Sequence, residues 1–435
     1  MAQDSPFFGG CRTVGLVVSN SDGGGVVKRL AQAVWLGSTV LVLFGWVAQS
    51  QGQQTPPTGQ TPPAAEGRSA TARVISPEVL PDKRVTFRLR APKANEVLIN
   101  GDWPGGRGIR MTKDATGVWS VTTEPLSPEI WSYTFSVDGV TMLDPGNYHA
   151  MRDGLRYLSP VLIPGDGSAM YQTGNVPHGT VSAVWYPSPV LKAERRLLVY
   201  TPPGYEGTTA KYPTMYLFHG GSADEEAWNM LGVFNLIMDN LIARGKAKPM
   251  IVVLPNAYWH EPAVLDVGGV RRPSGPGVTG GAGQNYGEAE QDIVEGVVPF
   301  VEKRFRALSG RDNRAITGLS MGGGIAINVG LKRLDVFASV GEFSSGMFGG
   351  VGGYAAYDIE RISPGFLKDS SVTNRKLKLL YLSCGTEDPR MPFQTKAADD
   401  LRTHGIRLTF KSFPGAHEWR VWRSSLADFA PLLFR

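Results

Sequence analysis

The sequence predicts an α/β protein in which a mostly parallel sheet covered by helices is preceded by a small immunoglobulin-like β-sandwich. Three observations predict this class: strand-like runs alternate with helical stretches across residues 178–435, residues 73–170 hold short strands with no helical pattern, and a serine turn flanked by glycines joins a strand to a helix at residues 318–322. Strands that alternate with helices are typical of parallel sheets, and closely spaced short strands are typical of sandwiches.

Length and composition favour a folded chain of more than one domain. The 435 residues exceed one ordinary domain, and 42% of them are hydrophobic, enough to bury a core. Lys and Arg number 44 against 39 Asp and Glu, with no basic run, so nucleic acid is not an expected partner. Cys11 and Cys384 are too few for a disulfide framework or a cysteine-based zinc site.

Residues 1–72 predict a leader and a linker. Lys28 and Arg29 precede the apolar stretch 30–48, which fits an export signal. A membrane anchor is the alternative, because a stretch of about 19 residues approaches the length that spans a bilayer. We expect a secreted or periplasmic protein, with membrane contact only if this segment stays attached. Residues 49–72 contain two Thr-Pro-Pro units and no large apolar residue, so they predict an extended linker.

Residues 73–170 predict the β-sandwich. Apolar and polar residues alternate over residues 84–90 and 131–138, and a period of two is typical of half-buried strands. The dipeptide at residues 138–139, Asp-Gly, lies between two apolar runs and predicts a hairpin. The pieces VLINGDW and WSYTFSVDGV resemble the early-set, immunoglobulin-like domain related to family 48 carbohydrate-binding modules. The resemblance implies glycan contact through a tryptophan; packing is the alternative, and we favour it for Trp103, Trp119 and Trp131.

Residues 178–435 predict the parallel sheet with helices on both faces. Residues 234–244 and 290–306 are expected to be helical, and six short apolar runs between and around them are expected to be strands. The expected strands are residues 197–200, 215–218, 251–254, 315–317, 379–383 and 408–411.

The strongest motif is Gly-Leu-Ser-Met-Gly at residues 318–322. It follows the strand RAIT and opens a helical run, which is the strand–turn–helix setting of a nucleophile elbow in an α/β-hydrolase fold. The glycines are needed because a Cβ at either position would collide with neighbouring backbone in so sharp a turn. The hydroxyl of Ser320 is therefore expected above the sheet edge, at a helix N-terminus that favours a developing oxyanion.

A serine nucleophile needs a histidine base oriented by a carboxylate, and in this fold the chain order is Ser, acid, His. His417 follows a strand in a loop and is favoured over His404, which lies in an expected helix. Glu387 and Asp388 both follow the strand 379–383. Asp388 is favoured as the acid, since the chain turns at the next residue, a proline.

The oxyanion needs two backbone N–H groups. One is expected from Met321 and the other from Gly221 in the turn HGGS, with Gly220 or Ser222 as alternatives. His219 is expected to be a structural residue of that turn. No HExxH motif is present, and the glycine-rich residues 277–287 contain no Gly-Lys-Ser/Thr, so neither a metal nor an organic cofactor is expected.

The segments YLFHGGSADEEAW, RAITGLSMGGG, SCGTEDP and FPGAHEWRVWR resemble the esterase family that covers enterochelin-esterase-like proteins and the feruloyl and acetylxylan esterases of carbohydrate esterase family 1. The resemblance spans roughly residues 73–435. It implies a Ser320–Asp388–His417 triad and hydrolysis of feruloyl or acetyl esters of plant polysaccharides; an acyltransferase or a siderophore-ester hydrolase is the alternative. Residues 258–287, long and glycine-rich, depart from the family. Trp228, Trp259, Trp419 and Trp422 are expected near the site, where stacking on a phenolic acyl group of the substrate is one role and packing is the alternative.

Overall fold

The β-sandwich consists of two antiparallel sheets that share one core. One sheet has the order β1-β2-β6-β5, and the other has the order β4-β3-β7-β10-β9 with β8 paired to β7. Phe87 of the first sheet and Tyr133 of the second are fully buried, with ring centroids 4.5 Å apart. The bounds are β1 Glu78–Val79, β2 Val85–Arg90, β3 Val97–Gly101, β4 Ile109–Arg110, β5 Thr112–Lys113, β6 Val118–Thr122, β7 Ile130–Val137, β8 Val140–Met142, β9 Met151–Asp153 and β10 Arg156–Leu162.

The expected hairpin is the turn between β7 and β8. Asp138 and Gly139 both have positive φ, 47° and 87°, as a two-residue turn of type I′ requires. The three tryptophans of the sandwich are buried, with exposed fractions of 4%, 6% and 2% for Trp103, Trp119 and Trp131. This burial fits packing, the favoured alternative, although Trp103 and Trp131 also line the cavity described below.

A second, mixed sheet forms the α/β part of the protein and has the order β11-β12-β14-β13-β15-β16-β17-β18 in the described ranges. The pairs β11–β12 and β12–β14 are antiparallel, and the other pairs are parallel. All six predicted strands are present, while β11 and β16 were not predicted. The bounds are β11 Thr180–Ser188, β12 Ala193–Thr201, β13 Thr214–Phe218, β14 Ile251–Pro255, β15 Arg314–Gly318, β16 Ser339–Phe343, β17 Leu379–Gly385 and β18 Thr409–Phe413.

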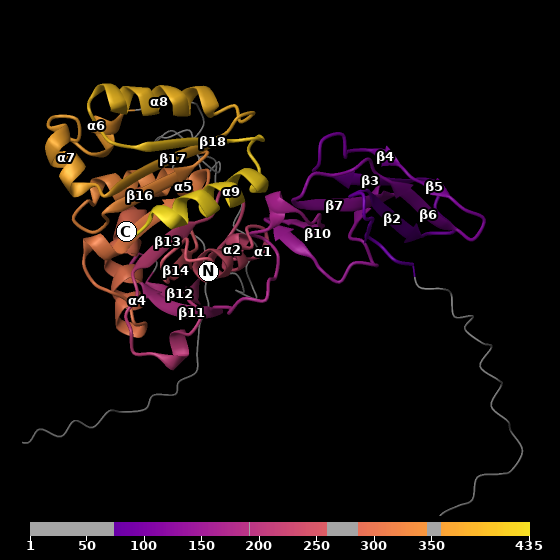
Figure 1. Ribbon diagram of the computed structural model, residues 1–435, viewed down its shortest axis with the longest axis horizontal. Helices are drawn as coiled ribbons and strands as arrows, with labels where there is room; N and C mark the ends of the chain where they lie inside the picture. Colours follow the sequence, from indigo (N-terminus) through magenta and orange to yellow (C-terminus); the bar gives the residue numbers. More distant parts are fainter. Residues whose placement is uncertain (1–73, 191, 259–285, 346–357) are drawn as a thin grey trace, which may run out of the picture. The chain divides into compact units, whose positions relative to one another are not determined.

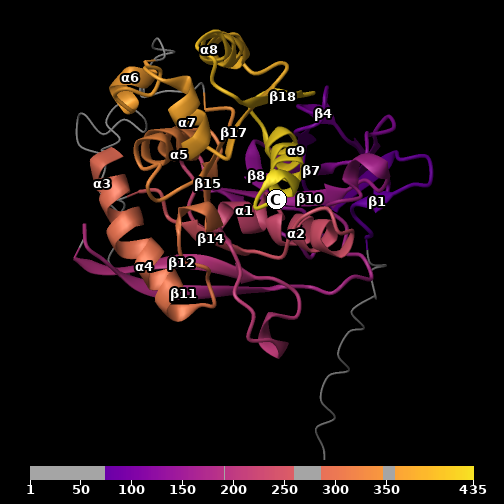
Figure 2. The same cartoon turned by 60° about the vertical axis from the view of Figure 1, so that its left-hand side comes forward.

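Helices cover both faces of this sheet (Figures 1 and 2). Alternate residues of one strand enter different cores: Tyr216 belongs to the core that includes residues of α5 and α8, whereas Met215 belongs to the core that includes residues of α2 and α9. The bounds are α1 Ala227–Met230, α2 Phe234–Ala243, α3 Tyr286–Gln291, a π-helical turn Asp292–Val297, α4 Val298–Arg304, α5 Met321–Lys332, α6 Ile359–Ile362, α7 Ser370–Lys376, α8 Met391–Thr403 and α9 Trp419–Phe429.

The structure, a computed structural model, describes residues 74–190, 192–258, 286–345 and 358–435 (Figure 1). The predicted leader and linker, most of the segment 258–287, and Trp259 lie outside the described residues. In the ranges just given, the helices are too short or too polar to cross a membrane. Both the sandwich and the mixed sheet belong to one unit, Ala72–Arg435.

Candidate active site

The elbow between β15 and α5 presents Ser320. This residue has φ 51° and ψ −117°, a conformation that a non-glycine residue adopts only where its surroundings impose it. A Cβ at Gly318 would lie 2.6 Å from the backbone of Gly322, and one at Gly322 would overlap the carbonyl oxygen of His219. The two glycines are therefore required by close backbone packing, as the motif predicts.

Ser320, His417 and Asp388 form a continuous hydrogen-bonded chain. The Oγ of Ser320 lies 2.9 Å from Nε2 of His417, and Nδ1 of His417 lies 2.7 Å from Oδ2 of Asp388. The three residues follow β15, β18 and β17, whose carboxyl ends meet at one edge of the parallel sheet. The structure thus brings together the three residues that the sequence singles out as nucleophile, base and acid.

Asp388 is held as an anion by several donors. The backbone N–H of Arg390 donates to Oδ1 at 2.9 Å, and the Arg390 guanidinium lies 3.3 Å from the same oxygen. Burial by itself would raise the pKa of Asp388, but the hydrogen bonds from His417 and Arg390 outweigh it and hold the pKa below its usual value. The alternatives lie elsewhere: Glu387 is exposed, and His404 ends α8 in solvent.

The turn after β13 lies against the elbow. A Cβ at Gly220 would lie 2.5 Å from Leu319 Cδ1 and 3.4 Å from Ser320 Cβ, so a larger residue here would require the Leu319 side chain to shift. Gly221 comes next and lines the same cavity as Ser320, while Met321 begins α5 directly after Ser320. The assignment of the Gly221 and Met321 N–H groups to an oxyanion stays a prediction.

His219 has a structural position in this turn. The N–H of Ala257 donates to Nε2 at 2.9 Å, so the ring proton is on Nδ1, which lies 2.8 Å from the carbonyl oxygen of Gly220. Burial lowers the pKa of His219, which keeps the ring neutral. The bond to Gly220 lies within the turn, and the bond from Ala257 joins the turn to the residues that follow β14.

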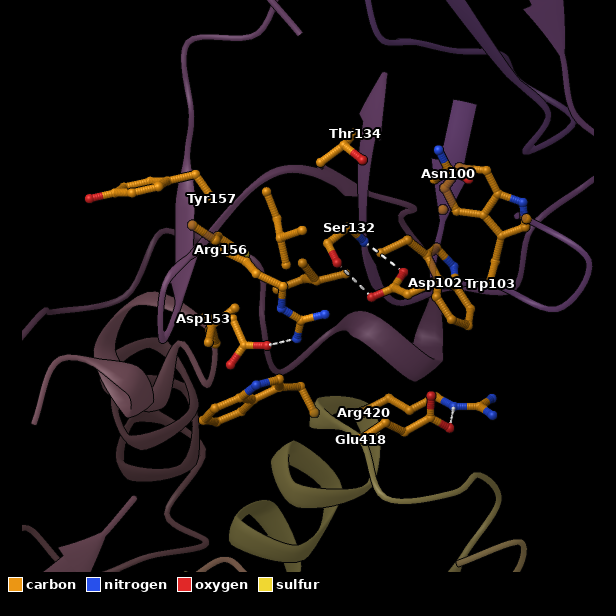
Figure 3. A pocket seen from close by; sticks show the side chains of 18 of the residues that line it. Asn100, Asp102, Trp103, Ser132, Thr134, Asp153, Arg156, Tyr157, Glu418 and Arg420 are labelled. Carbon is orange, nitrogen blue, oxygen red and sulfur yellow. Dashed lines mark hydrogen bonds and ion pairs between the residues drawn. The ribbon is translucent and has the colours of Figure 1, made fainter. Parts of the chain in front are cut away.

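A cavity of about 1350 Å³ extends from Ser320 to the β-sandwich. Ser320, Gly221 and His417 line it from the α/β part. The sandwich contributes Asn100, Asp102, Ser132, Thr134, Asp153, Arg156 and Tyr157. In Figure 3 these sandwich side chains face the cavity from one side, and Glu418 and Arg420, from the start of α9, face it from the other. No local pattern predicts this junction, because it joins segments that are far apart in the chain.

The aromatic candidates separate into two groups. Trp419 and Trp422 line the cavity, and the Trp422 ring packs edge-on against His417 with centroids 4.9 Å apart. Trp228 is 1% exposed, and its indole N–H donates to the carbonyl oxygen of Phe218 at 3.0 Å. Its predicted role in substrate binding is therefore wrong, because its ring faces are covered by core side chains.

The mixed sheet, the elbow and the Ser–His–Asp chain define the α/β-hydrolase fold class. Residues 188–433, more than half of the chain, match the family model described as "Putative esterase". The protein belongs to this esterase family.

Similar proteins carry related names. The endo-1,4-β-xylanase/feruloyl esterase of Xylanibacter ruminicola is 29% identical over 356 residues, which cover 80% of this chain and 44% of that protein. An esterase of Mycobacterium tuberculosis is 30% identical over 151 residues, covering 34% of this chain and 28% of that one. The chain thus spans less than half the length of these relatives. The solved structure of enterochelin esterase from Shigella flexneri matches with a TM-score of 0.56 at 18% identity, covering 82% of this chain and 94% of that chain, which supports the fold.

Proposed function

We propose that this protein is a serine esterase that removes an acyl group, feruloyl or acetyl, from a plant polysaccharide. The observation that carries the proposal is the hydrogen-bonded chain from the Ser320 hydroxyl through His417 to Asp388. Feruloyl esterase is part of the name of the Xylanibacter relative, whose similarity covers 80% of this chain. Residues 178–435 alone make up a smaller share of the chain than this, so the similarity extends into the sandwich.

In the proposed reaction His417 Nε2 takes the proton of Ser320 as its oxygen attacks the ester carbonyl. Asp388 accepts the Nδ1–H hydrogen bond, which fixes the tautomer and stabilises the imidazolium. The N–H groups of Gly221 and Met321 receive the oxyanion. The alcohol leaves with the proton from His417, and water then repeats the sequence on the acyl-enzyme.

The cavity supports a large alcohol component. Its volume of about 1350 Å³ exceeds the range of roughly 300–1,000 Å³ that is common for small-ligand pockets. The polar side chains of the sandwich that face it can hydrogen-bond the hydroxyl groups of a sugar chain. Export through the leader 1–48 belongs to the same proposal, since a polysaccharide substrate lies outside the cell.

The test is initial-rate hydrolysis of 4-nitrophenyl acetate, methyl ferulate and a feruloylated arabinoxylan oligosaccharide. The wild type is expected to cleave all three, whereas Ser320→Ala and His417→Ala lose activity with an unchanged circular dichroism spectrum. His404→Ala, at an exposed histidine, is the matched control and keeps wild-type rates. Acyl transfer to an added sugar instead of water would favour an acyltransferase, and a wild type inactive on every ester would refute the proposal.

A further inference from the structure

The tip of the β9–β10 hairpin contacts the turn that faces Ser320. We call residues 219–226, between β13 and α1, the glycine loop. Gly154, at the hairpin tip, has φ 61°, and a Cβ at this position would overlap the carbonyl oxygen of Ser222. The sandwich and the glycine loop therefore meet backbone to backbone.

An ion pair reinforces this contact. The Arg152 guanidinium donates to the Asp224 carboxylate, and these side chains are only 21% and 12% exposed. Arg152 also donates to the carbonyl oxygen of Gly154 at 3.3 Å. Asp224 in turn accepts the backbone N–H of Glu226 at 3.0 Å. One arginine of the sandwich thus fixes both its own hairpin tip and the second half of the glycine loop.

The remainder of the glycine loop is fixed from the mixed sheet. The N–H of Ala257 donates a hydrogen bond to His219. The buried Glu225 carboxylate accepts hydrogen bonds from the Arg196 guanidinium at 2.7 Å and from the Asn256 side-chain amide at 2.9 Å. These bonds hold the two ends of the loop. The middle, which contains the predicted oxyanion donor Gly221, depends on other contacts.

Ser222 is the strained point in the middle of the loop. Its φ of 62° is left-handed, a conformation that a serine keeps only where its surroundings determine it. Its N–H donates to the hydroxyl of Tyr258, and its carbonyl oxygen lies against Gly154. The two peptides that meet at Ser222 are therefore held from different sides: the Gly221–Ser222 peptide by Tyr258, which follows β14, and the Ser222–Ala223 peptide by the hairpin tip of the sandwich.

We propose that the β9–β10 hairpin positions the glycine loop over Ser320, with Arg152 and Gly154 as positioning residues for the oxyanion-binding N–H of Gly221. The inference rests on the proposed function and makes the sandwich a working part of the esterase site. Arg152 and Gly154 touch neither substrate nor the reacting atoms; they act through the loop.

The test compares Arg152→Met and Gly154→Ala with matched controls in the full chain. Gly139→Ala is the control for backbone strain, because Gly139 is also a hairpin glycine with positive φ, but an added Cβ would meet no atom of the described residues within 4 Å. Arg110→Met is the control for loss of an ion pair, because Arg110 pairs with Glu96 on the exposed surface of the sandwich. Arg152→Lys, which keeps the charge, is the rescue variant.

Loss of one oxyanion donor costs about 10²–10³ in kcat, so a displaced donor is expected to cost about tenfold or more. For 4-nitrophenyl acetate we expect Arg152→Met and Gly154→Ala to lower kcat by that factor, with KM within about twofold of the wild-type value. Arg152→Lys should recover part of the lost kcat. Gly139→Ala and Arg110→Met should match the wild type. The inhibition constant of phenylboronic acid, which forms a tetrahedral adduct with serine, should rise by the same factor.

Unchanged kcat in Arg152→Met and Gly154→Ala would overturn the inference, as would an equal loss in Gly139→Ala. A fall in kcat without weaker boronic acid binding would also overturn it, because a merely loosened fold is then the cause. These results leave the proposed function intact whenever the wild type cleaves the ester and Ser320→Ala does not. A wild type that neither cleaves esters nor reacts with a fluorophosphonate at Ser320 would overturn both.

Discussion

The guanidinium of Arg423 lies 3.0 Å from the carboxylate of Glu129, and both side chains are at least nine-tenths buried. Arg423 belongs to α9, which begins two residues after His417, whereas Glu129 immediately precedes β7 of the sandwich. Arg423 also donates to the carbonyl oxygens of Ile130 at 2.9 Å and Leu231 at 2.7 Å. A buried cation therefore joins the sandwich to the helix that follows His417.

Loss of this cation should destabilise the protein strongly. Arg423→Met removes the cation that pairs with the buried Glu129 carboxylate, which keeps only the backbone N–H of Ile130, and two buried carbonyl oxygens lose the donor that Arg423 supplies. Breaking a buried pair from one side costs about 3–5 kcal/mol. Urea-induced unfolding at pH 7 measures the change. Arg84→Met, which breaks the exposed pair with Asp82, serves as the control and should cost at most about 1 kcal/mol. Equal stabilities of the two variants would contradict a structural role for the buried pair.

The acid of the triad can be tested against its neighbour in the sequence. Asp388→Asn keeps the shape of the side chain but removes the acceptor that fixes the His417 tautomer, so kcat should fall by about 10⁴. Glu387→Gln, one residue earlier and exposed, should leave kcat unchanged. Rates with 4-nitrophenyl acetate at pH 7 decide between them. The opposite pattern, with Glu387→Gln inactive, would move the acid to Glu387.

Ser320, Asp388 and His417 could be predicted because their signals are local. The elbow needs glycine at 318 and 322, and Asp388 and His417 each follow a strand that is recognisable in the sequence, so fold and candidate site follow from adjacent residues. The strand β16 escaped prediction because Gly341 and Glu342 are residue types that are depleted in strands. The strand β11 is an edge strand with Pro187 near its end, which weakens its pattern.

The junction between sandwich and site has no local signal. Arg423 and Ile130 are 293 positions apart, and Arg152 and Asp224 are 72 apart, so no period or motif connects them. Trp228 was misjudged for a related reason: its place near HGGS in the sequence suggested the cavity, but α1 turns its ring into the core against Phe343. Separation along the chain therefore predicted neither which residues are in contact nor the direction in which the Trp228 ring points.

The two tryptophans Trp228 and Trp419, whose rings lie edge to face with centroids 5.4 Å apart, should respond differently to truncation. Trp228→Ala empties a core site and should cost about 3–5 kcal/mol of unfolding free energy. Trp419→Ala removes part of the cavity wall and should raise KM for methyl ferulate several-fold. Urea unfolding and initial rates on both variants give the comparison, and a Trp228→Ala protein of wild-type stability with a raised KM would restore Trp228 to the substrate site.

Glu342 should give the protein a pH-dependent stability. Its carboxylate is fully buried at the end of β16, where it accepts the N–H of Ser345 at 2.8 Å and a hydrogen bond from Gln394. Burial raises the pKa of Glu342 from 4.5 to about 7, against the opposing effect of these donors. Between these two values the native state holds a proton that the unfolded state has lost.

The unfolding free energy should therefore fall as pH rises from about 5 to 7, by about 3 kcal/mol from this group alone. Glu342→Gln cannot ionise, so the variant should lose this fall and gain stability relative to the wild type between pH 5 and pH 8. Urea unfolding at both pH values gives the difference for each protein. Glu194→Gln, at an exposed glutamate of β12, should follow the wild type. A Glu342→Gln variant whose stability relative to the wild type is the same at both pH values would show that Glu342 titrates near its ordinary pKa.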